Sequence, residues 1–505
     1  MKTSLNYKNF FKGKKITVHG LGLLGRGIGD VIFLAQQGAD LTVTDLKTED
    51  QLALSLAQIK KALKPEVFKK IKFVLGEHKL ENFRNKDFIL KAAGVPIDSE
   101  FIEEAKKNKI PIKMDASWLA ELVEGACPER SRRVKIIGVT GTRGKSTVTH
   151  LIYEILKAWR PEGNPLGSVQ GFPSGRVFLG GNVRGLATLP LLKKVKKGDI
   201  VVMELDSWQL QGFADSKISP NISVFTNLMV DHQNYYGSTS LTTSSNPMNL
   251  YFADKANIYR WQKKGDYLVA GGEVAKRIKL DLKKSRHALD CLGQLIVPDA
   301  EIIPKSWKIK LLGEHNLLNI AYAVTVARIL DVPEKIIKQV VENYAGVPGR
   351  LEFLREVKGV KYYNDTTATT PDGVIAALKA LNLPRRRSSG NFPMTVVGAG
   401  AKIILIGGGR DKELDYKKYA PVVKKSVKAL ALFQGTATDK IIKILNKTKF
   451  PVQVFDNMPS AFTWANSFAQ KGDIVLLSPG AASFGVFKNE FDRGDQFVNL
   501  VKKIK

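Results

Sequence analysis

Cysteine, histidine and long apolar runs are scarce in this chain of 505 residues. Its two cysteines, Cys127 and Cys291, lack the spacing of metal ligands, and so low a count fits a reducing cytosol. No run approaches the roughly 18 consecutive apolar residues that a membrane-spanning helix needs. The N-terminal sequence MKTSLNYKNFFKGKK has no apolar core of the kind that a secretory signal requires. We therefore expect a cytoplasmic protein without membrane insertion.

Acidic residues are also few: 48 aspartates and glutamates face 78 lysines and arginines, which leaves a net charge of +30. A polyanionic partner such as nucleic acid is one explanation of this surplus. However, the lysines are spread along the whole chain, and no basic block carries the interleaved aromatic residues that stack on bases. We expect no nucleic-acid partner, and a basic cleft would also suit a small substrate rich in phosphates and carboxylates.

Three successive blocks of the chain alternate strand-like and helix-like patterns, and the chain is too long for a single core. Such alternation implies parallel sheets covered by helices. We predict an α/β protein of three domains: a Rossmann-like domain over 1–133, a central P-loop-type ATPase domain over 134–345 and a second Rossmann-like domain over 346–505. Segments near 127–133 and 385–401 have the composition of insertions.

The clearest strand patterns are short aliphatic or β-branched runs. They cover 15–20 and 41–45 in the first block, 134–139, 199–205 and 221–228 in the second, and 402–408, 427–433, 452–455 and 473–480 in the third. Helical patterns cover 26–37, 148–159, 248–260 and 314–330.

The most specific motif is TGTRGKST at 140–147, which joins a predicted strand to a predicted helix. Glycines let backbone N–H groups approach phosphate oxygens, and the helix N-terminus adds the positive end of its dipole. Lys145 can reach the terminal phosphates, and the hydroxyl of Ser146 or Thr147 can bind Mg²⁺. A Walker A loop would have glycine at Val139, so a tight turn without a ligand is the alternative. The motif predicts binding of ATP or GTP by Gly141, Thr142, Arg143, Gly144, Lys145, Ser146 and Thr147.

A second glycine motif, Gly20-x-Gly22-x-x-Gly25, follows the first strand and opens the first helix. Asp45 ends the next strand, 20 residues after Gly25. This is the layout of a Rossmann-type diphosphate site, which by itself indicates NAD or FAD. Close packing of a helix on a strand is the alternative, because the glycine pattern alone is weakly specific.

Polar side chains also end the central strands. Glu204 ends a strand beside the phosphate loop, where a carboxylate can hold Mg²⁺ or can simply face solvent. His232 follows the next strand, directly after Asp231, and is either a functional or a structural histidine. Lys255 lies within a predicted helix, where a surface lysine is the default interpretation.

Three later motifs are rich in polar groups. Asn316 and Asn319 lie one turn apart on one helix face, where their amides can read adenine or cap the helix. The sequences YNDTTATTP at 363–371 and SPGAAS at 478–483 each join a strand to a helix. Their hydroxyl and carboxylate groups indicate either a polar site or a capping loop.

Together, the wording, order and spacing of these motifs resemble the Mur ligases over nearly the whole chain. The resemblance rests on TGTRGKST, ELDSWQL, DH, GEHNLLN, GVPGRLE, YNDTTAT and LSPGAAS. HGLGLLGRG near the N-terminus and FGVFKNEFDRGDQF near the C-terminus are most similar to the members that add D-glutamate. The resemblance implies an ADP-forming ligase that joins D-glutamate to UDP-N-acetylmuramoyl-L-alanine through an acyl phosphate, in peptidoglycan precursor synthesis.

The resemblance also implies a role for each motif. Lys145 would stabilise the transferring phosphoryl group. Two Mg²⁺ ions would be held, one by Ser146 and Glu204 and one by His232 with Lys255 as its carbamate. ATP would also contact Asn316, Asn319, Arg350 and Asp365. The UDP substrate would contact Gly22, Leu23, Leu24, Gly25, Asp45, Gly94 and Asn182. The amino acid would contact Thr369, Lys412 and Ser483. We expect a monomer with small-molecule substrates.

Three positions depart from the pattern of the D-glutamate-adding members. Thr367 stands where they have lysine, Gly349 stands where they often have histidine, and Glu490 precedes the final Phe491. These positions border the amino-acid pocket or the ATP phosphates, so a ligase for another amino acid is one alternative. An NAD(P)-dependent oxidoreductase, based on GLGLLG, is another, but it leaves TGTRGKST and ELDSWQL unexplained. A basic nucleic-acid-binding ATPase is the third, and the scattered lysines argue against it.

Overall fold

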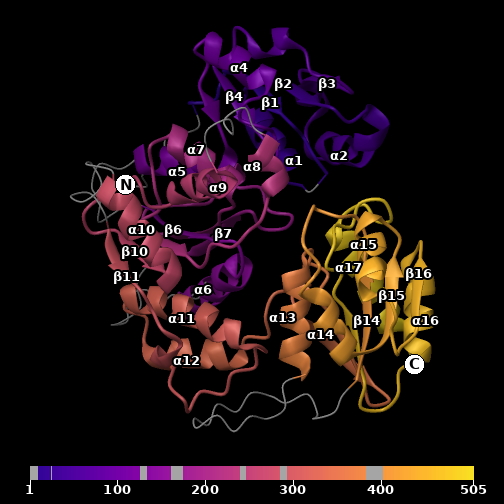
Figure 1. The fold of residues 1–505 in the computed structure, drawn as a ribbon. Coiled ribbons are helices and arrows are strands. Elements are labelled where there is room, and N and C mark those ends of the chain that lie inside the picture. The colour runs from indigo at the N-terminus through magenta and orange to yellow at the C-terminus, as the bar shows by residue number, and fades with distance from the viewer. Residues whose placement is uncertain are drawn as a thin grey trace. The chain divides into compact units, whose positions relative to one another are not determined.

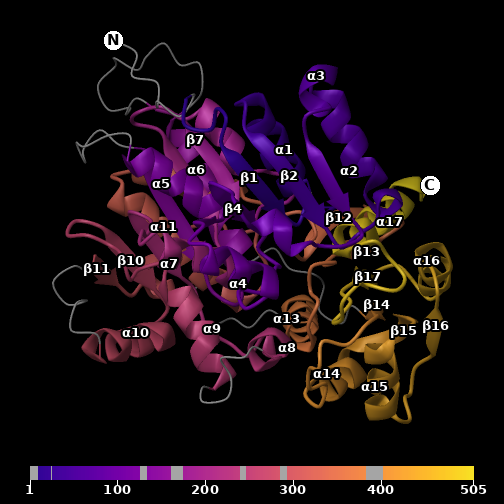
Figure 2. The ribbon, with the colours of Figure 1, turned by 90° about the horizontal axis from the view of Figure 1, so that it is seen from above.

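The computed structural model describes residues 9–23, 25–125, 134–160, 175–238, 246–284, 293–382 and 402–504. Leu24, both cysteines and the two insertion-like segments lie outside these ranges. The chain divides into two compact units, Met1–Asp299 with Ala321–Ile337 and Ala300–Ile320 with Lys338–Lys505. Figures 1 and 2 show the helices and strands of each unit in two views.

The first sheet has five parallel strands in the order β3-β2-β1-β4-β5. The strands are β1 Lys15–His19, β2 Asp40–Asp45, β3 Lys72–Leu75, β4 Phe88–Lys91 and β5 Ile112–Lys113. The helices are α1 Arg26–Gln36, α2 Glu49–Ala62, α3 Pro65–Phe68, η1 Leu80–Phe83, α4 Glu100–Lys107 and α5 Asp115–Gly125. Chain order reverses between β1 and β4, and ligands of such sheets bind beyond the carboxyl ends of the strands at this point. The turn from Gly22 to Gly25 follows β1 and therefore lies at the reversal.

The second sheet has six parallel strands in the order β11-β10-β9-β6-β8-β7. The strands are β6 Lys135–Thr140, β7 Val177–Gly181, β8 Ile200–Glu204, β9 Ile222–Phe225, β10 Tyr267–Ala270 and β11 Gln294–Ile296. Val139 pairs with Glu204 on one side of β6, and Thr140 pairs with Phe225 on the other. The phosphate loop, Glu204 and the residues after Phe225 therefore leave the sheet at the same edge.

Helices and short 3₁₀ turns join these strands and continue the chain to the third sheet. They are α6 Lys145–Trp159, η3 Leu189–Lys193, α7 Ser207–Asp215, α8 Gln233–Ser238, α9 Pro247–Ala256, α10 Gly272–Lys284, η5 Ala300–Ile302, α11 Glu314–Ile329 and α12 Glu334–Asn343. α6 follows the central strand directly, so the start of this helix lies at the sheet edge where the loop emerges.

The first two sheets share one hydrophobic core, which explains why they fall in a single unit. Trp118 on α5 packs edge-on against Phe11, with ring centroids 5.1 Å apart, and its ring lies 5.1 Å from that of Phe88. The same apolar cluster includes Leu210 and Phe213 of α7, which belongs to the second sheet's part of the chain. α5 therefore contributes its apolar face to a core that both sheets use.

The third sheet has the order β12-β13-β17-β14-β15-β16. Its strands are β12 Glu352–Val357, β13 Val360–Asn364, β14 Ile403–Gly408, β15 Val427–Phe433, β16 Val452–Phe455 and β17 Ile474–Leu477. Its helices are α13 Pro371–Asn382, α14 Tyr419–Ser426, α15 Thr436–Leu445, α16 Met458–Ser467 and α17 Glu490–Lys503. Alternate residues of β14 join separate apolar clusters, one with α13, α14 and α15 and the other with α16 and α17. Helices thus cover both faces of this sheet.

The predicted strands and helices are confirmed, with differences at some ends. α6 begins at Lys145 rather than 148, and β9 ends at Phe225 rather than 228. β9 ends early because the next residues bond to the phosphate loop instead of continuing the ladder. β12 runs antiparallel to β13, an exception to the parallel pairing that the alternation implied. In the described part of the chain, none of the helices combines the length and apolar character that a bilayer crossing requires.

We expect Trp118→Ala to lower the free energy of unfolding of the first unit by about 3–5 kcal/mol, because the truncation leaves a cavity in the shared core. Chemical denaturation followed by circular dichroism measures the change. Trp261→Ala is the matched control, since Trp261 is 37% exposed and its loss should cost about 1 kcal/mol or less. Equal losses in the two variants would contradict the shared core.

Candidate functional site

The phosphate loop lies against the end of β9. Gly141 has a φ of 139°, and a Cβ atom there would lie 2.0 Å from Oγ1 of Thr226. That hydroxyl donates to the carbonyl of Arg143 at 2.6 Å. Gly144 directly precedes α6, and Thr147 is buried in the first turn of that helix. The close approach of the loop to β9 therefore depends on glycine at position 141.

Asn227, which the sequence motifs did not single out, holds the same loop with three hydrogen bonds. Its Oδ1 accepts from the N–H of Arg143 at 2.8 Å, and its Nδ2 donates to the Arg143 carbonyl at 3.1 Å. Its own carbonyl accepts from the N–H of Thr142 at 3.0 Å. Because these two N–H groups are already paired, a phosphate would meet the N–H groups nearer the start of α6. A Thr-Asn pair directly after a buried strand was the available sequence signal.

The start of α6 brings a hydroxyl and a carboxylate together. The hydroxyl of Ser146 donates to Oε2 of Glu204 at 2.6 Å, and Nδ2 of Asn182 lies 3.4 Å from Oε1 of the same carboxylate. Nζ of Lys145 donates to the carbonyl of Thr142 at 3.2 Å. Glu204 is buried, so the alternative of a strand end that faces solvent is wrong.

Lys255 on α9 is 1% exposed, so the default interpretation of a surface lysine is also wrong. Its Nζ donates to the carbonyl of Gly141 at 2.9 Å and to Oγ1 of Thr140 at 3.3 Å. Burial, and to a smaller extent the charge of Lys145, lowers the pKa of Lys255 well below its ordinary value. At a given pH, a larger fraction of Lys255 is therefore the uncharged, nucleophilic amine than at an ordinary lysine.

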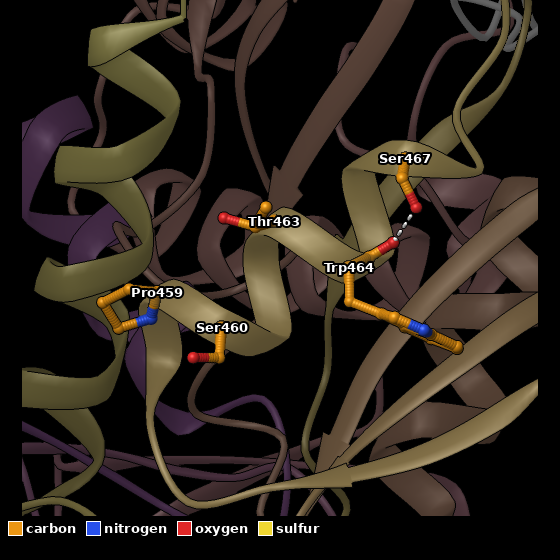
Figure 3. A pocket seen from close by; sticks show the side chains of 5 residues that line it. All are labelled: Pro459, Ser460, Thr463, Trp464 and Ser467. Atoms are coloured by element: carbon orange, nitrogen blue, oxygen red, sulfur yellow. Dashed lines mark hydrogen bonds between the residues drawn. The ribbon is translucent and has the colours of Figure 1, made fainter.

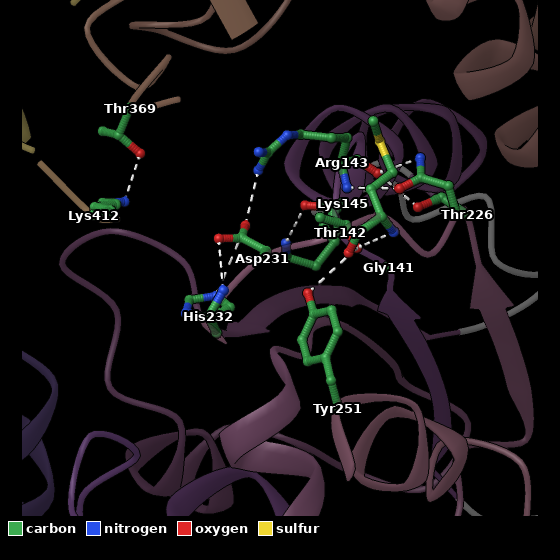
Figure 4. A network of polar contacts seen from close by, with 12 residues as sticks. Gly141, Thr142, Arg143, Lys145, Thr226, Asp231, His232, Tyr251, Thr369 and Lys412 are labelled. Atoms are coloured by element: carbon green, nitrogen blue, oxygen red, sulfur yellow. Dashed lines mark hydrogen bonds and ion pairs between the residues drawn. The ribbon is translucent and has the colours of Figure 1, made fainter. Parts of the chain in front are cut away.

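His232 and Lys255 approach the same aromatic ring. His232 follows β9 with a φ of 53°, and its Nε2 lies 4.0 Å from Oδ2 of Asp231. The same carboxylate oxygen pairs with Nη1 of Arg143 at 3.1 Å (Figure 4). The ring of Tyr251 lies 5.9 Å from the His232 ring, and its centroid lies 4.7 Å from Nζ of Lys255. Residues from the loop, from the turn after β9 and from α9 thus meet at one place.

The donor atoms at this place fit a hard divalent cation. Ser146 and Glu204 offer oxygens, which Mg²⁺ prefers. Among the described residues, no group of three or more histidine, cysteine, aspartate or glutamate side chains could hold a metal ion. A cation here would therefore take its other ligands from phosphate and water, as Mg²⁺ usually does. His232 adds one nitrogen, and Lys255 adds an oxygen ligand only when it carries a carboxylate.

Asp45 forms part of the glycine-rich turn in the first sheet. Its Oδ2 accepts from the N–H groups of Leu21 and Gly22, both at 2.9 Å. Its Oδ1 accepts from the N–H of Lys47, also at 2.9 Å. Asp45 is buried, so it stabilises the shape of the turn and keeps only its remaining lone pairs for a ligand.

The other residues expected at the UDP site follow the carboxyl ends of neighbouring strands. Gly25 precedes α1 after β1, and Gly94 follows β4. Leu23 is 47% exposed, and Leu24 lies outside the described residues. A Cβ atom on Gly25 would lie 3.7 Å from Cα of Gly185, close to the segment that carries Asn182.

In the second unit, Asn316 and Asn319 share a face of α11. Nδ2 of Asn319 donates to Oδ1 of Asn316 at 2.8 Å, and Nδ2 of Asn316 donates to the carbonyl of Leu312 at 2.7 Å. The predicted spacing is confirmed. The two amides orient each other, and the second also closes the turn before the helix.

Asp365 lies at the end of β13 and is held from two sides. Its Oδ1 accepts from the N–H of Leu351, next to Arg350, at 3.0 Å, and its Oδ2 accepts from the hydroxyl of Ser478 at 2.8 Å. Burial raises the pKa of Asp365 to about 7, and the hydrogen bond from Ser478 opposes this shift. A carboxyl group near its pKa at neutral pH can both donate and accept a hydrogen bond.

The three residues expected to bind the amino acid lie on three loops of the second unit. Nζ of Lys412 donates to Oγ1 of Thr369 at 2.9 Å (Figure 4), and Ser483 is buried in the loop after β17. Two of the positions that depart from the family pattern are partners, because the hydroxyl of Thr367 donates to the carbonyl of Gly349 at 2.9 Å.

A surface hollow on the second unit contains none of these residues. Pro459, Ser460, Thr463, Trp464 and Ser467 line it, and all five belong to α16 (Figure 3). Binding sites usually combine polar groups from several elements. This hollow therefore does not compete with the strand-end loops as a candidate site.

Family models match two stretches of the chain. The model of the Mur ligase middle domain matches residues 139–327, which include the phosphate loop, Glu204, His232 and Lys255. The model described as the Mur ligase, glutamate ligase domain matches residues 349–480, which include Asp365, Thr369 and Lys412.

Curated relatives match along their whole length. A UDP-N-acetylmuramoylalanine–D-glutamate ligase of Roseiflexus sp. is 34% identical, over 97% of this chain and 98% of the relative. Ligases of the same name from Borreliella burgdorferi and Acetivibrio thermocellus are 31% and 32% identical. The alignment with the Borreliella ligase covers 98% of both chains, and the alignment with the Acetivibrio ligase covers 100% of both.

Solved structures share the fold. The UDP-N-acetylmuramate–alanine ligase MurC of Thermotoga maritima matches 97% of this chain and 100% of its own, with a TM-score of 0.56 at 17% identity. MurF of Acinetobacter baumannii matches 98% of this chain and 92% of its own, with a TM-score of 0.54 at 13% identity. The family models and the full-length relatives show that the chain belongs to the Mur ligase family.

Proposed function

We propose that this chain is an ATP-dependent, ADP-forming ligase that adds D-glutamate to UDP-N-acetylmuramoyl-L-alanine in peptidoglycan precursor synthesis. The observation that carries the proposal is the likeness to ligases of that name over essentially the whole of both chains, at 31–34% identity. The phosphate loop, the Ser146–Glu204 pair and the buried Lys255 support it, because a phosphoryl transfer needs phosphate binding and charge neutralisation.

The proposed reaction has two steps. The terminal carboxylate of the UDP substrate attacks the γ-phosphorus of ATP, the bond from that phosphorus to ADP breaks, and an acyl phosphate forms. The amine of D-glutamate then attacks the acyl carbon to give a tetrahedral intermediate. This intermediate collapses as the carbon–oxygen bond to phosphate breaks and the nitrogen loses a proton, which leaves an amide and inorganic phosphate.

The chain's own groups would position and neutralise rather than form bonds. Lys145 would offset charge on the transferring phosphoryl group, and the N–H groups at the start of α6 would bind its oxygens. Ser146 and Glu204 would hold Mg²⁺, which supplies Lewis-acid neutralisation of the phosphates when bound. Asn316 and Asn319 would meet adenine, while Arg350 and Asp365 would meet the ribose and phosphates.

Lys255 would act with His232 at a second Mg²⁺ after conversion to a carbamate. The uncharged amine attacks the carbon of carbon dioxide, and a carbon–nitrogen bond forms as one carbon–oxygen π bond opens onto oxygen. The nitrogen then loses one proton, so the neutral amine becomes an anionic carbamate. The lowered pKa of Lys255 favours the amine that this step needs. The product supplies the oxygen ligand that a hard cation requires.

The remaining roles complete the proposal. Gly22, Leu23, Leu24, Gly25, Asp45, Gly94 and Asn182 would bind the UDP substrate. Thr369, Lys412 and Ser483 would bind the carboxylates of D-glutamate. We also propose three domains, with boundaries near 133 and 345, and a monomer. A cytoplasmic location is supported by the low cysteine count.

Two alternative functions are supported to different extents. An NAD(P)-dependent oxidoreductase rested on the glycine motif of the first sheet, and family membership accounts for that motif without a nicotinamide cofactor. One observation still favours a ligase for a different amino acid. Thr367 bonds to Gly349 and presents no lysine to the pocket. The substrate panel that tests the main proposal also tests this alternative.

We expect phosphate release from ATP to require both UDP-N-acetylmuramoyl-L-alanine and D-glutamate. A coupled phosphate assay against a panel of D- and L-amino acids measures this requirement. Release with the same UDP substrate but a different amino acid would support the proposed mechanism and contradict the proposed specificity for D-glutamate. Absence of release with every pair would contradict the proposed function.

We expect Ser146→Ala and Glu204→Gln each to reduce kcat by about 10–100-fold and to raise the Mg²⁺ concentration for half-maximal activity, because each removes an oxygen from the cation site. A Mg²⁺ titration of initial rates measures both effects. Ser216→Ala is the matched control, since the hydroxyl of Ser216 donates to Glu121 at 2.9 Å in the same unit but outside the site. An unchanged Mg²⁺ dependence in both site variants would rule out this cation site.

We expect Lys255→Ala to lose activity and to regain part of it when short-chain carboxylic acids such as acetate are added, because these supply the missing carboxylate. Initial rates with and without acetate measure the rescue. Lys276→Ala, which removes an exposed lysine paired with Glu273, should be unaffected by either change. Full activity of Lys255→Ala without additives would exclude the carbamate.

A further inference from the structure

Arg493 on α17 is the second-largest side chain among those fully buried in the described residues, and it is 0% exposed. Arginine is almost never fully buried unless it is paired. Its guanidinium donates from Nη2 to the carbonyl of Thr366 at 2.8 Å, from Nε to the hydroxyl of Thr366 at 3.2 Å and from Nη1 to the carbonyl of Ala481 at 3.3 Å. In the described part of the chain, no carboxylate is within ion-pair distance of it. The side chain thus makes its hydrogen bonds to two loops, and the charge of Glu490 acts on it from beyond ion-pair distance.

The two loops that Arg493 joins carry residues expected to bind the amino acid. Thr366 opens the loop after β13, which also holds Thr369, and Ala481 lies in the loop after β17, which also holds Ser483. β13 and β17 are parallel neighbours in the sheet, so their loops leave it side by side. The loops also bond directly, from the N–H of Gly480 to the carbonyl of Ala368 at 2.7 Å and from Ser478 to Asp365. The planar guanidinium adds a bridge with donors in a fixed arrangement and so helps to set their spacing.

The start of α17 is shaped to fit this contact. The hydroxyl of Thr366 donates to the carbonyl of Glu490 at 2.7 Å. A Cβ atom on Gly494 would lie 2.6 Å from Cγ2 of Thr366, so glycine lets the helix approach this closely. Arg493 thus contacts Thr366 through its guanidinium, and Gly494 contacts the same threonine through its backbone.

A charge in this position has a cost that packing alone would not explain. An apolar side chain of similar size could fill the same space without desolvation of a cation. Burial lowers the pKa of Arg493 to about 10, so the group remains protonated at neutral pH. A retained cation behind two loops favours a ligand that carries carboxylates.

We propose that Arg493 is a positioning residue of the amino-acid subsite, which holds the loops of Thr369 and Ser483 at the spacing that a dicarboxylic amino acid requires. The inference rests on the proposed function. Asp365 has its own anchors in Leu351 and Ser478, so the nucleotide contacts depend less on Arg493. Loss of the guanidinium should therefore weaken binding of the amino acid selectively.

The test compares the three Michaelis constants of the full-length protein and of Arg493→Lys, which keeps the charge and loses the fork. We expect the KM for D-glutamate to rise about tenfold or more. The KM values for ATP and for the UDP substrate should change less than about twofold. Arg355→Gln is the matched control, because Nη1 of Arg355 donates to the carbonyl of Lys502 at the far end of the same helix. Its three KM values should remain those of the unmodified protein.

A second readout bypasses the amino-acid subsite. Hydroxylamine attacks acyl phosphates directly, so hydroxamate formation from ATP and the UDP substrate reports the first step alone. Arg493→Lys should keep this rate while it loses affinity for D-glutamate. A parallel fall in both rates, an equal rise in all three KM values, or an unchanged KM for D-glutamate would overturn the inference.

Gly494→Ala keeps the test decisive if Arg493→Lys does not fold. Its added methyl group displaces Thr366 without removing the arginine, so the same selective rise in the KM for D-glutamate is expected. An unchanged KM in this variant would overturn the inference. If the unmodified protein forms neither hydroxamate nor phosphate with any substrate pair, the proposed function itself fails, and this outcome is distinct from an unselective variant.

Discussion

The candidate site in the first unit depends on the hydrogen bonds that hold the phosphate loop against the end of β9. Thr226 and Asn227 bond to the backbone of residues 142 and 143, and the missing side chain of Gly141 allows the contact. The contact extends further, because the hydroxyl of Tyr322 on α11 donates to the carbonyl of Thr226 at 3.0 Å. Displacement of this strand end would shift the loop, Lys145 and the bond from Lys255 to Gly141 together.

Buried ionisable groups recur wherever this structure gathers functional residues. Lys255 and Asp365 are each held by uncharged partners, and burial shifts the pKa of each toward its neutral form. Such shifts cost folding free energy, since the charged forms lose more from dehydration than they regain from nearby opposite charges, such as Asp206 for Lys255 and Arg350 for Asp365. Proteins retain groups of this kind where chemistry needs them, so their placement is itself an argument about function.

Much of the site could be predicted because parallel strands end at one edge of a sheet. From the sequence alone, that rule predicts the loop of Lys145 beside Glu204. The position of Asn227 directly after a strand was a signal for the same edge, but its bond to Arg143, 84 residues away, could not be predicted because it depends on how the two segments pack. The rule could not show that Lys255 is buried, or that Asp45 turns inward to the glycine turn, since both depend on packing between distant segments.

The shared core of the first two sheets also bears on how such proteins can recombine. Where α5 meets α7, a Cβ atom on Gly212 would lie 2.6 Å from Oγ of Ser117 and 2.9 Å from Cβ of Met114. A contact this tight is matched residue by residue on both sides. The N-terminal block therefore cannot be exchanged by itself. In a chimera with the corresponding block of a relative, α5 would not match α7 of this chain, so α7 would have to be exchanged as well.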